Sequence, residues 1–111
     1  MFFPLQMGAV SALSQSKDWF KNLNFEYSKR RKLVWELADK LNCNFSRSSS
    51  GMFVWAKIKS NKTSIDYVDS LLNEKGVFIA PGSIFGSNGE GYVRISLCNS
   101  EINIKKAISR L

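Results

Sequence analysis

The sequence predicts an α+β fold of two layers, in which a short, mainly antiparallel sheet has helices packed on one face. Amphipathic helical segments and short β-type segments follow one another in the order helix, helix, strand, helix, strand, strand, helix. The 111 residues, 44% of them hydrophobic, are enough to bury one core but not two. We therefore expect a single packed domain to occupy most of the chain.

Two helices are expected in the first 41 residues. Pro4 suits the first turn of a helix that continues through LQMGAVSAL. A longer amphipathic helix is expected from about Lys17 to Leu41, because its apolar residues recur at spacings of three and four. These residues are Trp19, Phe20, Leu23, Tyr27, Val34, Leu37, Ala38 and Leu41. The polar segment NCNFSRSSSG, residues 42–51, then predicts a loop that ends at Gly51.

The middle of the chain predicts a strand followed by a helix. MFVWAKIK, residues 52–59, alternates like a strand but starts with apolar residues on both sides, so we expect both of its faces to be covered. TSIDYVDSLLNEKG, residues 63–76, carries its own helix boundaries. Thr63 and Asp66 form a capping box, and Gly76 is a C-terminal stop.

The last third predicts two strands and a closing helix. VFIAPG, residues 77–82, reads as a short strand that Pro81 and Gly82 end, and SIFGSNGEG, residues 83–91, reads as a loop. A second strand lies within GEGYVRISLC, residues 89–98. NSEINIKKAISRL, residues 99–111, predicts a helix with Asn99 or Ser100 as its N-terminal cap.

The strand within residues 89–98 has two different faces. Alternate residues on one face are apolar and belong to the core, whereas the other face carries Tyr92 and Arg94. Phe53 and Trp55, with Phe78 as a further candidate, are expected to share this second face. An exposed arginine on an open sheet face is the simplest explanation of Arg94. The mixture of aromatic rings with one cation favours instead a face that lines a cleft against a part absent from this chain.

Charge and composition limit the other function classes. The formal charge of +7 allows a nucleic-acid partner. The only basic run, residues 29–32, would spread around the whole circumference of a helix, so it is expected to be a solvated surface, and no nucleic-acid partner is expected. Cys43 and Cys98, in a chain without histidine, argue against a metal site. No apolar run approaches the roughly 20 residues of a membrane span, so we expect a soluble cytoplasmic protein without a membrane partner.

Five segments occur in the order and near the spacing found in a known family. PLQMGAVSAL, EYSKRRKLV, GMFVWAKI, GVFIAPGSIFG and GEGYVRISLC resemble the C-terminal part of fold-type I, class I/II pyridoxal-phosphate-dependent aminotransferases. The resemblance covers essentially the whole chain and is nearest to the aspartate and LL-diaminopimelate aminotransferase branch. It implies that residues 1–16 end a large domain and connect it to a small domain formed by residues 17–111.

The resemblance also implies roles for individual residues. Arg94 matches the arginine that binds the α-carboxylate of the amino-acid substrate, which suits the two parallel N–H donors of a guanidinium. Phe85, in the loop that approaches the active site, and Tyr92 are further substrate-binding candidates, with ordinary packing as the alternative for each. Arg30 and Arg31 resemble a family pattern for which we expect a surface or interdomain contact.

The chain departs from the family in what it lacks. The lysine that holds pyridoxal phosphate, the acid that pairs with its ring and the groups that bind its phosphate all belong to the large domain of the family. We therefore expect a fragment that binds no cofactor and no metal and is inactive alone, whether or not Met1 is a natural start.

The partners and reaction of the full-length enzyme follow only in outline. Its expected partners are an amino acid, a 2-oxo acid, the missing large domain and a second subunit of a homodimer. A lyase or synthase of the same family stays open, as does a stand-alone basic module that stacks single-stranded nucleic acid on the sheet aromatics.

Overall fold

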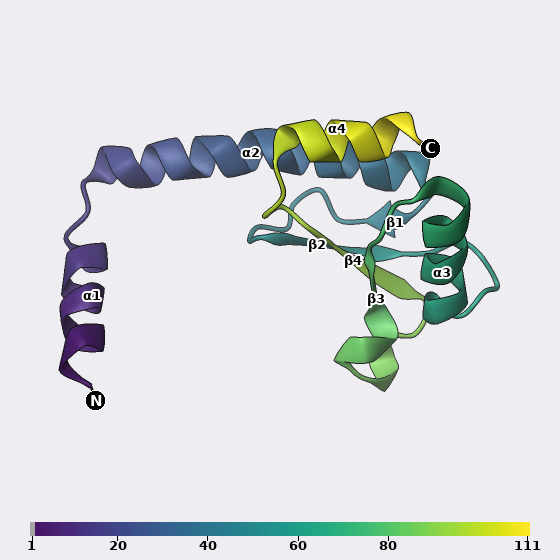
Figure 1. Ribbon diagram of the computed structural model, residues 1–111, viewed down its shortest axis with the longest axis horizontal. Helices are drawn as coiled ribbons and strands as arrows, with labels where there is room; N and C mark the ends of the chain where they lie inside the picture. The colour runs from purple at the N-terminus through teal and green to yellow at the C-terminus, as the bar shows by residue number, and fades with distance from the viewer. Residues whose placement is uncertain (1) are drawn as a thin grey trace.

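The computed structural model describes residues 2–111 and has the predicted α+β architecture (Figure 1). Its four α-helices are α1 (Phe3–Leu13), α2 (Lys17–Lys40), α3 (Ser64–Lys75) and α4 (Glu101–Ser109). Its strands are β1 (Asn44–Phe45), β2 (Phe53–Lys57), β3 (Ala80–Pro81) and β4 (Tyr92–Ser96). Two short 3-10 helices, η1 (Gly82–Phe85) and η2 (Ser87–Gly89), lie between β3 and β4.

The four strands form one sheet in the order β1-β2-β4-β3, and every neighbouring pair is antiparallel. Trp55 lies opposite Arg94, and Val54 lies opposite Ile95. Because side chains alternate along a strand, this register gives the sheet two chemically distinct faces. Alternate residues of β2 and β4 are buried, and they form one core with α2, α3 and α4. The helices thus cover one face of the sheet, as the sequence predicts.

The helix boundaries confirm the predicted capping signals. Thr63 Oγ1 accepts a hydrogen bond from the Asp66 backbone N–H at 3.1 Å and donates one to the Asp66 carboxylate at 2.7 Å. Gly76 ends α3 with a left-handed φ of 62°, a conformation that glycine adopts without a Cβ penalty. Of the two candidates for the α4 cap, Ser100 is the one that accepts from the backbone of Asn103.

Three local assignments differ from the sequence-based expectation. Residues 44–45, expected within a loop, form the edge strand β1 because they pair with Ala56 and Lys57 of β2. Residues 77–82 form a strand only at Ala80–Pro81, since their pairing with β4 covers only those two positions. The expected loop over residues 83–91 contains η1 and η2. For β1 and β3 the decisive contact comes from a distant part of the chain, which local periodicity does not report.

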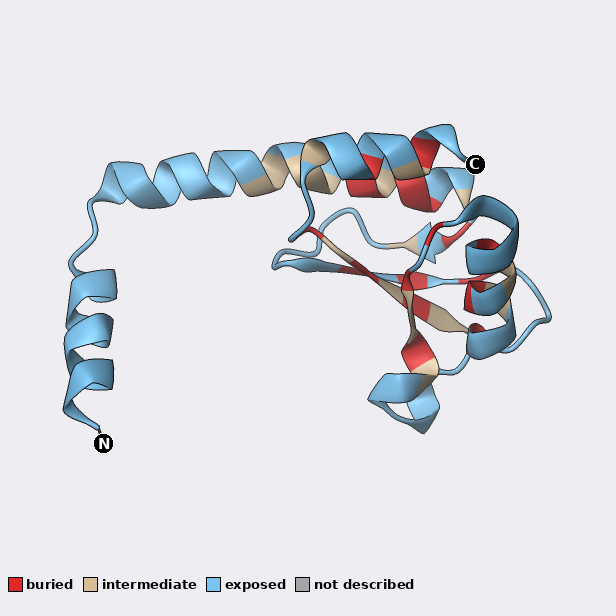
Figure 2. Cartoon of the chain, viewed as in Figure 1, coloured by how far each residue is buried: buried red, intermediate tan, exposed pale blue. Residues whose placement is uncertain are grey.

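The N-terminal arm, formed by α1 and the first half of α2, extends away from the packed part of the chain (Figure 1). Every residue of α1 is exposed, although Phe3, Leu5 and Leu13 are large and apolar (Figure 2). The arm raises the Cα radius of gyration to 16.8 Å, against about 13 Å for a compact chain of this length. No helix of residues 2–111 is both long enough and apolar enough to span a membrane.

Two arginines of the basic run fix α2 to the sheet. Arg30 Nη1 donates to the carbonyl of Leu97 at 3.3 Å, and Arg31 Nη2 donates to the carbonyl of Gly51 at 2.8 Å. Both side chains are half-buried, whereas Lys29 and Lys32 are exposed. The expectation of a wholly solvated basic surface is therefore wrong for these two arginines, because their long side chains reach unpaired carbonyls beside the strand ends.

Tyr67 joins α3 to the end of α2 and makes the stability depend on pH. Its hydroxyl donates to the carbonyl of Leu41 at 3.2 Å. Burial, with a smaller effect of nearby Cys43, raises the pKa of Tyr67 from 10.0 to about 12. Between these values the folded chain keeps a proton that the unfolded chain loses, so the free energy of unfolding falls as the pH rises.

We expect Tyr67→Phe to flatten the loss of stability above about pH 10. Urea unfolding of the variant and the unaltered chain at matched alkaline pH values measures this slope. Lysine deprotonation contributes equally to both proteins and cancels in the comparison. Equal slopes in the two proteins would contradict the assignment to Tyr67.

Candidate functional site

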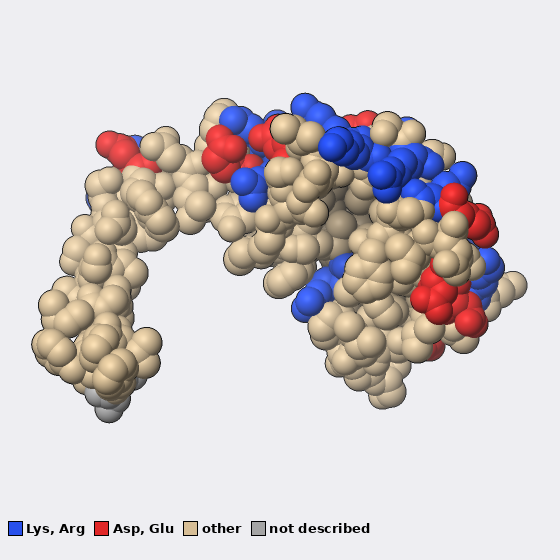
Figure 3. All heavy atoms as spheres, in the orientation of Figure 1, with Lys and Arg blue, Asp and Glu red and all other residues tan. Residues whose placement is uncertain are grey.

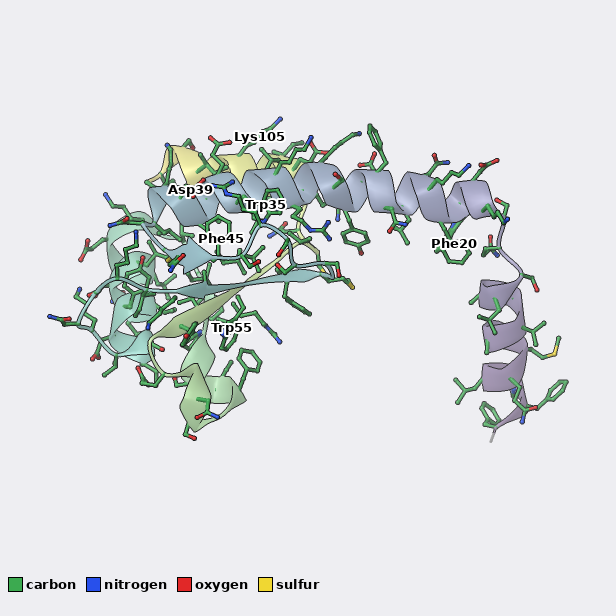
Figure 4. The ribbon with its side chains drawn as sticks, turned by 180° about the vertical axis from the view of Figure 1, so that it is seen from behind. Phe20, Trp35, Asp39, Phe45, Trp55 and Lys105 are labelled. Atoms are coloured by element: carbon green, nitrogen blue, oxygen red, sulfur yellow. The ribbon has the colours of Figure 1, made fainter. Side chains whose placement is uncertain are left out.

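The sheet face opposite the helices carries a compact group of aromatic rings around one arginine. Phe53 and Trp55 of β2 and Tyr92 and Arg94 of β4 project from this face, and Phe85 of η1 approaches it from the side. Trp55 points away from the layer formed by α2 and α4 (Figure 4). We call these five residues the aromatic face. Phe53 and Trp55 are 44% and 40% exposed, although large aromatic side chains are usually mostly buried.

Arg94 lies at the centre of the aromatic face, between two phenylalanines. Its Cζ is 4.1 Å from the centroid of the Phe53 ring and 3.9 Å from the centroid of the Phe85 ring. Both distances are well inside the range of about 6 Å over which a guanidinium is attracted to an aromatic ring. The two rings thus stabilise the guanidinium charge without a conventional hydrogen bond.

The N–H groups of Arg94 have no protein acceptor within residues 2–111. The ion pairs of this part of the chain join Lys21 to Asp18, Lys29 to Glu26 and Arg47 to Asp39, and the side chain of Arg94 takes part in none of them, nor in any hydrogen bond. A half-buried cation with five unused donors is prepared to bind an anion. A planar guanidinium matches a carboxylate with two parallel hydrogen bonds.

The other rings of the aromatic face extend the site along the sheet. Trp55 stacks on Tyr92 with ring centroids 5.5 Å apart and planes inclined by 16°, and it meets the edge of Phe85 at 6.0 Å. The exposed ammonium of Lys57 lies 5.9 Å above the Tyr92 ring. The face therefore presents an apolar wall beside Arg94 and has a second cation at its far end.

The position of Phe85 depends on a tightly packed loop. Gly82 and Gly89 approach so closely that a Cβ on Gly82 would clash with the carbonyl of Gly89 and lie 2.7 Å from the carbonyl of Tyr92. Ser64, which is fully buried, accepts from the Gly91 N–H at 2.8 Å and donates to the carbonyl of Gly89 at 3.3 Å. These contacts hold η1 and η2 against the start of α3 and so place Phe85 over Arg94.

Ser64→Ala is expected to lower the free energy of unfolding by about 1–2 kcal/mol, because it removes a buried hydroxyl that bonds both the N–H of Gly91 and the carbonyl of Gly89. Urea denaturation measures the loss. Ser70→Ala, in the same helix but on its more exposed side, is the matched control and should stay within about 0.5 kcal/mol of the unaltered chain. Equal losses in both variants would show that Ser64 does not hold the loop.

The described residues hold no cluster of three or more histidine, cysteine, aspartate or glutamate side chains that suits a metal ion. Cys43 is buried, and burial raises the pKa of its thiol, which keeps it protonated and unreactive at neutral pH. Cys98 is exposed and also unpaired. Neither cysteine belongs to the aromatic face.

A groove of about 250 Å³ opens on the β3 side of β4. It lies between residues 77–80 and helix α4. Its walls include Phe78, Ile95 and Ile104, and Arg94 is the one residue that it shares with the aromatic face. Phe78 is 68% exposed and makes no ring contact within residues 2–111. Phe78 thus points away from the core, unlike its buried neighbours Val77 and Ile79, and lies beside Arg94 without joining the cluster of rings.

The structure brings together all three site residues predicted from the sequence, since Arg94, Phe85 and Tyr92 belong to one cluster. Phe53 and Trp55 were expected on the same face but not as part of the site. The strand alternation in MFVWAKIK indicates their direction, whereas only the β2–β4 register shows that they flank Arg94.

Comparison with known proteins identifies the family. Residues 3–111 match the aminotransferase class I and II family. The chain is 37% identical over 111 residues to an LL-diaminopimelate aminotransferase of Maridesulfovibrio salexigens, covering all of this chain and 29% of that protein. It is 32% identical to an aspartate aminotransferase of Pyrococcus abyssi, covering 96% of this chain and 28% of that protein. The chain thus spans less than a third of the length of these relatives.

Solved structures agree with this match. An aromatic aminotransferase from Pyrococcus horikoshii superimposes with a TM-score of 0.80 at 31% identity, over 92% of this chain and 28% of that one. An aminotransferase from Staphylococcus aureus superimposes with a TM-score of 0.82 at 31% identity, over 99% of this chain and 29% of that one. With the fold and the order of its motifs, these matches show that the chain belongs to the class I and II aminotransferase family.

Proposed function

We propose that this chain is the C-terminal small domain of a pyridoxal-phosphate-dependent aminotransferase, and that Arg94 binds the α-carboxylate of its amino-acid substrate. The observation that carries the proposal is the half-buried guanidinium of Arg94, flanked by Phe53 and Phe85 and without any acceptor in the described residues. The full-length enzyme would transfer an amino group between an amino acid and a 2-oxo acid.

Arg94 contributes binding and orientation to this reaction. Each charge-assisted hydrogen bond from a guanidinium to a carboxylate contributes about 1.5–3 kcal/mol. Two such bonds fix the plane of the carboxylate and thereby the direction of the bonds at the neighbouring carbon. Pyridoxal phosphate, when bound, supplies the electron sink for the chemistry at that carbon.

The residues of the aromatic face do not by themselves fit the cofactor. A lysine that reacts with a carbonyl group is activated by removal from water or by a neighbouring cation. Lys57 is the one lysine of β2 and β4, and it is exposed, with its ammonium above the Tyr92 ring. We therefore assign cofactor binding to a large domain outside this chain.

The N-terminal arm supports the assignment of a missing large domain. Between Phe3 and Leu13 the arm carries five large apolar side chains, all more than half exposed. These are Phe3, Leu5, Met7, Val10 and Leu13. Residues 1–16 would end the large domain, and residues 17–111 would form the small domain. A homodimeric assembly and a cytoplasmic location stay predictions.

The substrate side chain is proposed only as a class. Three of the relatives and neighbours named above carry the names LL-diaminopimelate, aspartate and aromatic aminotransferase. LL-diaminopimelate is the first candidate to test, because the 37% identical relative carries that name. The apolar wall formed by Trp55 and Tyr92 fits the carbon chain of any of these substrates.

The proposal is tested with the complete reading frame that contains this chain. The full-length protein should show the absorbance of bound pyridoxal phosphate. Mixing it with an amino acid in a single turnover should convert the cofactor to its amine form and release one equivalent of the 2-oxo acid. Release of an elimination product, without the amine form, would place the protein among the lyases of the family. A complete protein without a cofactor-binding segment would reject the enzyme assignment.

The nucleic-acid alternative finds less support in the structure. Many basic side chains lie along α2 and α4 (Figure 3), whereas β2 and β4 together contain only Lys57 and Arg94 as cations. A single-stranded nucleic-acid surface needs cations beside its stacking rings. We expect no salt-dependent binding of a single-stranded oligonucleotide. Binding that weakens with salt and is lost in Trp55→Ala would restore this alternative.

A further inference from the structure

We propose that Phe53 and Phe85 are positioning residues that hold the guanidinium of Arg94 from both sides and so select planar anions. This inference rests on the proposed function, because it explains how Arg94 would distinguish a carboxylate from other anions. It adds two residues whose task is to orient the arginine, and it gives Phe85 a role other than direct contact with the substrate.

The two rings reach Arg94 from independent elements. Phe53 lies on β2, opposite Ser96 and therefore diagonal to Arg94, and a diagonal pair on one sheet face lies within reach of long side chains. Phe85 ends η1, in the loop that Gly82, Gly89 and Ser64 fix.

The rings lie on different sides of the guanidinium. Their centroids are 4.1 and 3.9 Å from the same Cζ atom. Among the described residues Phe53 and Phe85 make no ring contact with each other, although Trp55 contacts Phe85 at 6.0 Å. Two rings that covered the same side of Arg94 would have to touch. The guanidinium therefore lies between the two rings.

This enclosure has two physical consequences. An arginine side chain usually has many rotamers, and ordering it when a ligand binds costs conformational entropy. Rings that hold the side chain before the ligand arrives remove this cost from binding. An anion that binds the N–H groups of Arg94 would enter the gap between the two rings. A carboxylate lies in the plane of the guanidinium and fits this space, whereas a tetrahedral sulfate directs oxygen atoms out of that plane toward the rings.

The test uses nuclear magnetic resonance of the 111-residue chain with acetate and sulfate as probes. The Arg94 side-chain N–H signals report ring enclosure through ring-current shifts and report anion binding through titration. The variants are Phe53→Leu and Phe85→Leu. The matched control is Phe25→Leu, since Phe25 is exposed, lies on α2 and belongs neither to the aromatic face nor to the groove beside Arg94. Signals of the buried strand residues Val93 and Ile95 verify that each variant is folded.

We expect both variants to lose part of the ring-current shift and to bind acetate about two- to fivefold more weakly, as the loss of one exposed cation–π contact predicts. Sulfate binding should weaken less, so that the preference for acetate falls. Phe53→Tyr, which keeps a ring, should restore acetate binding. Phe25→Leu should match the unaltered chain.

The outcomes separate this inference from the proposed function. Acetate binding at Arg94 that is equal in the unaltered chain and both leucine variants would overturn the positioning role and leave the carboxylate site standing. An unchanged preference for acetate over sulfate would overturn the selection of planar anions. Ring-current shifts without any acetate response at Arg94 in the unaltered chain would count against the proposed function, and the inference would fail with it.

Discussion

Arg94→Lys in the full-length protein is expected to lower kcat/KM for the amino-acid substrate by about 10- to 100-fold. The reason is that a lysine keeps the positive charge but loses the second of the two parallel hydrogen bonds that a guanidinium makes to a carboxylate. The contacts of the guanidinium with Phe53 and Phe85 are lost as well. The absorbance of the bound cofactor should be retained, since Arg94 has no part in holding it. Steady-state kinetics with the amino acid, together with the visible spectrum, measure both effects.

Arg47→Lys is the matched control for this experiment. Arg47 also lies close to two rings, Phe45 and Trp35, at 5.1 and 5.8 Å from their centroids. Its guanidinium is already paired with Asp39 at 2.7 Å, and it lies outside the aromatic face. Unchanged kinetics in Arg47→Lys with a loss in Arg94→Lys would support the assignment. Equal kinetics in both variants would reject a substrate role for Arg94.

Leu97→Ala is expected to lower the free energy of unfolding by about 2–5 kcal/mol, the usual cost of removing a large apolar side chain from a packed core. Leu97 directly follows β4 and is 0% exposed. Its backbone also connects two elements, since its N–H donates to the carbonyl of Met52 at 2.9 Å and its carbonyl accepts from Arg30. Urea denaturation of the 111-residue chain measures the change.

Leu72→Ala provides the comparison for this stability change. Leu72 lies on α3 and is 42% exposed, so it contributes less buried apolar surface. We expect a loss below about 1 kcal/mol for this variant. If Leu97→Ala cost no more than Leu72→Ala, the apolar face of β4 could not be the centre of the core, and the assignment of the two sheet faces would have to be reversed.

The helices and their ends are the part of the fold that the sequence predicts best. The period of three to four in residues 17–41 matches α2, and the capping signals of Thr63 and Gly76 lie where α3 begins and ends. These features depend on residues that are near one another in the chain. The same holds for the alternation in β2 and β4, which places Arg94 opposite the core.

Features that depend on distant contacts could not be predicted in this way. β1 exists because Asn44 and Phe45 meet the outer edge of β2, and nothing in their polar surroundings reports this pairing. The enclosure of Arg94 needs both the register that brings Phe53 near it and the close approach of Gly82 to Gly89 that fixes Phe85. A sequence shows that these residues are present, but only the folded chain shows that they meet.

The most direct measurement is a crystal structure of the full-length protein with an amino-acid substrate or a carboxylate inhibitor bound. We expect both oxygen atoms of one carboxylate to accept hydrogen bonds from the Arg94 guanidinium at about 2.7–2.9 Å, with Phe53 and Phe85 still on its two sides. A carboxylate held by other residues, with the N–H edge of Arg94 turned to solvent or paired with an acid of the large domain, would contradict the proposed role of this arginine.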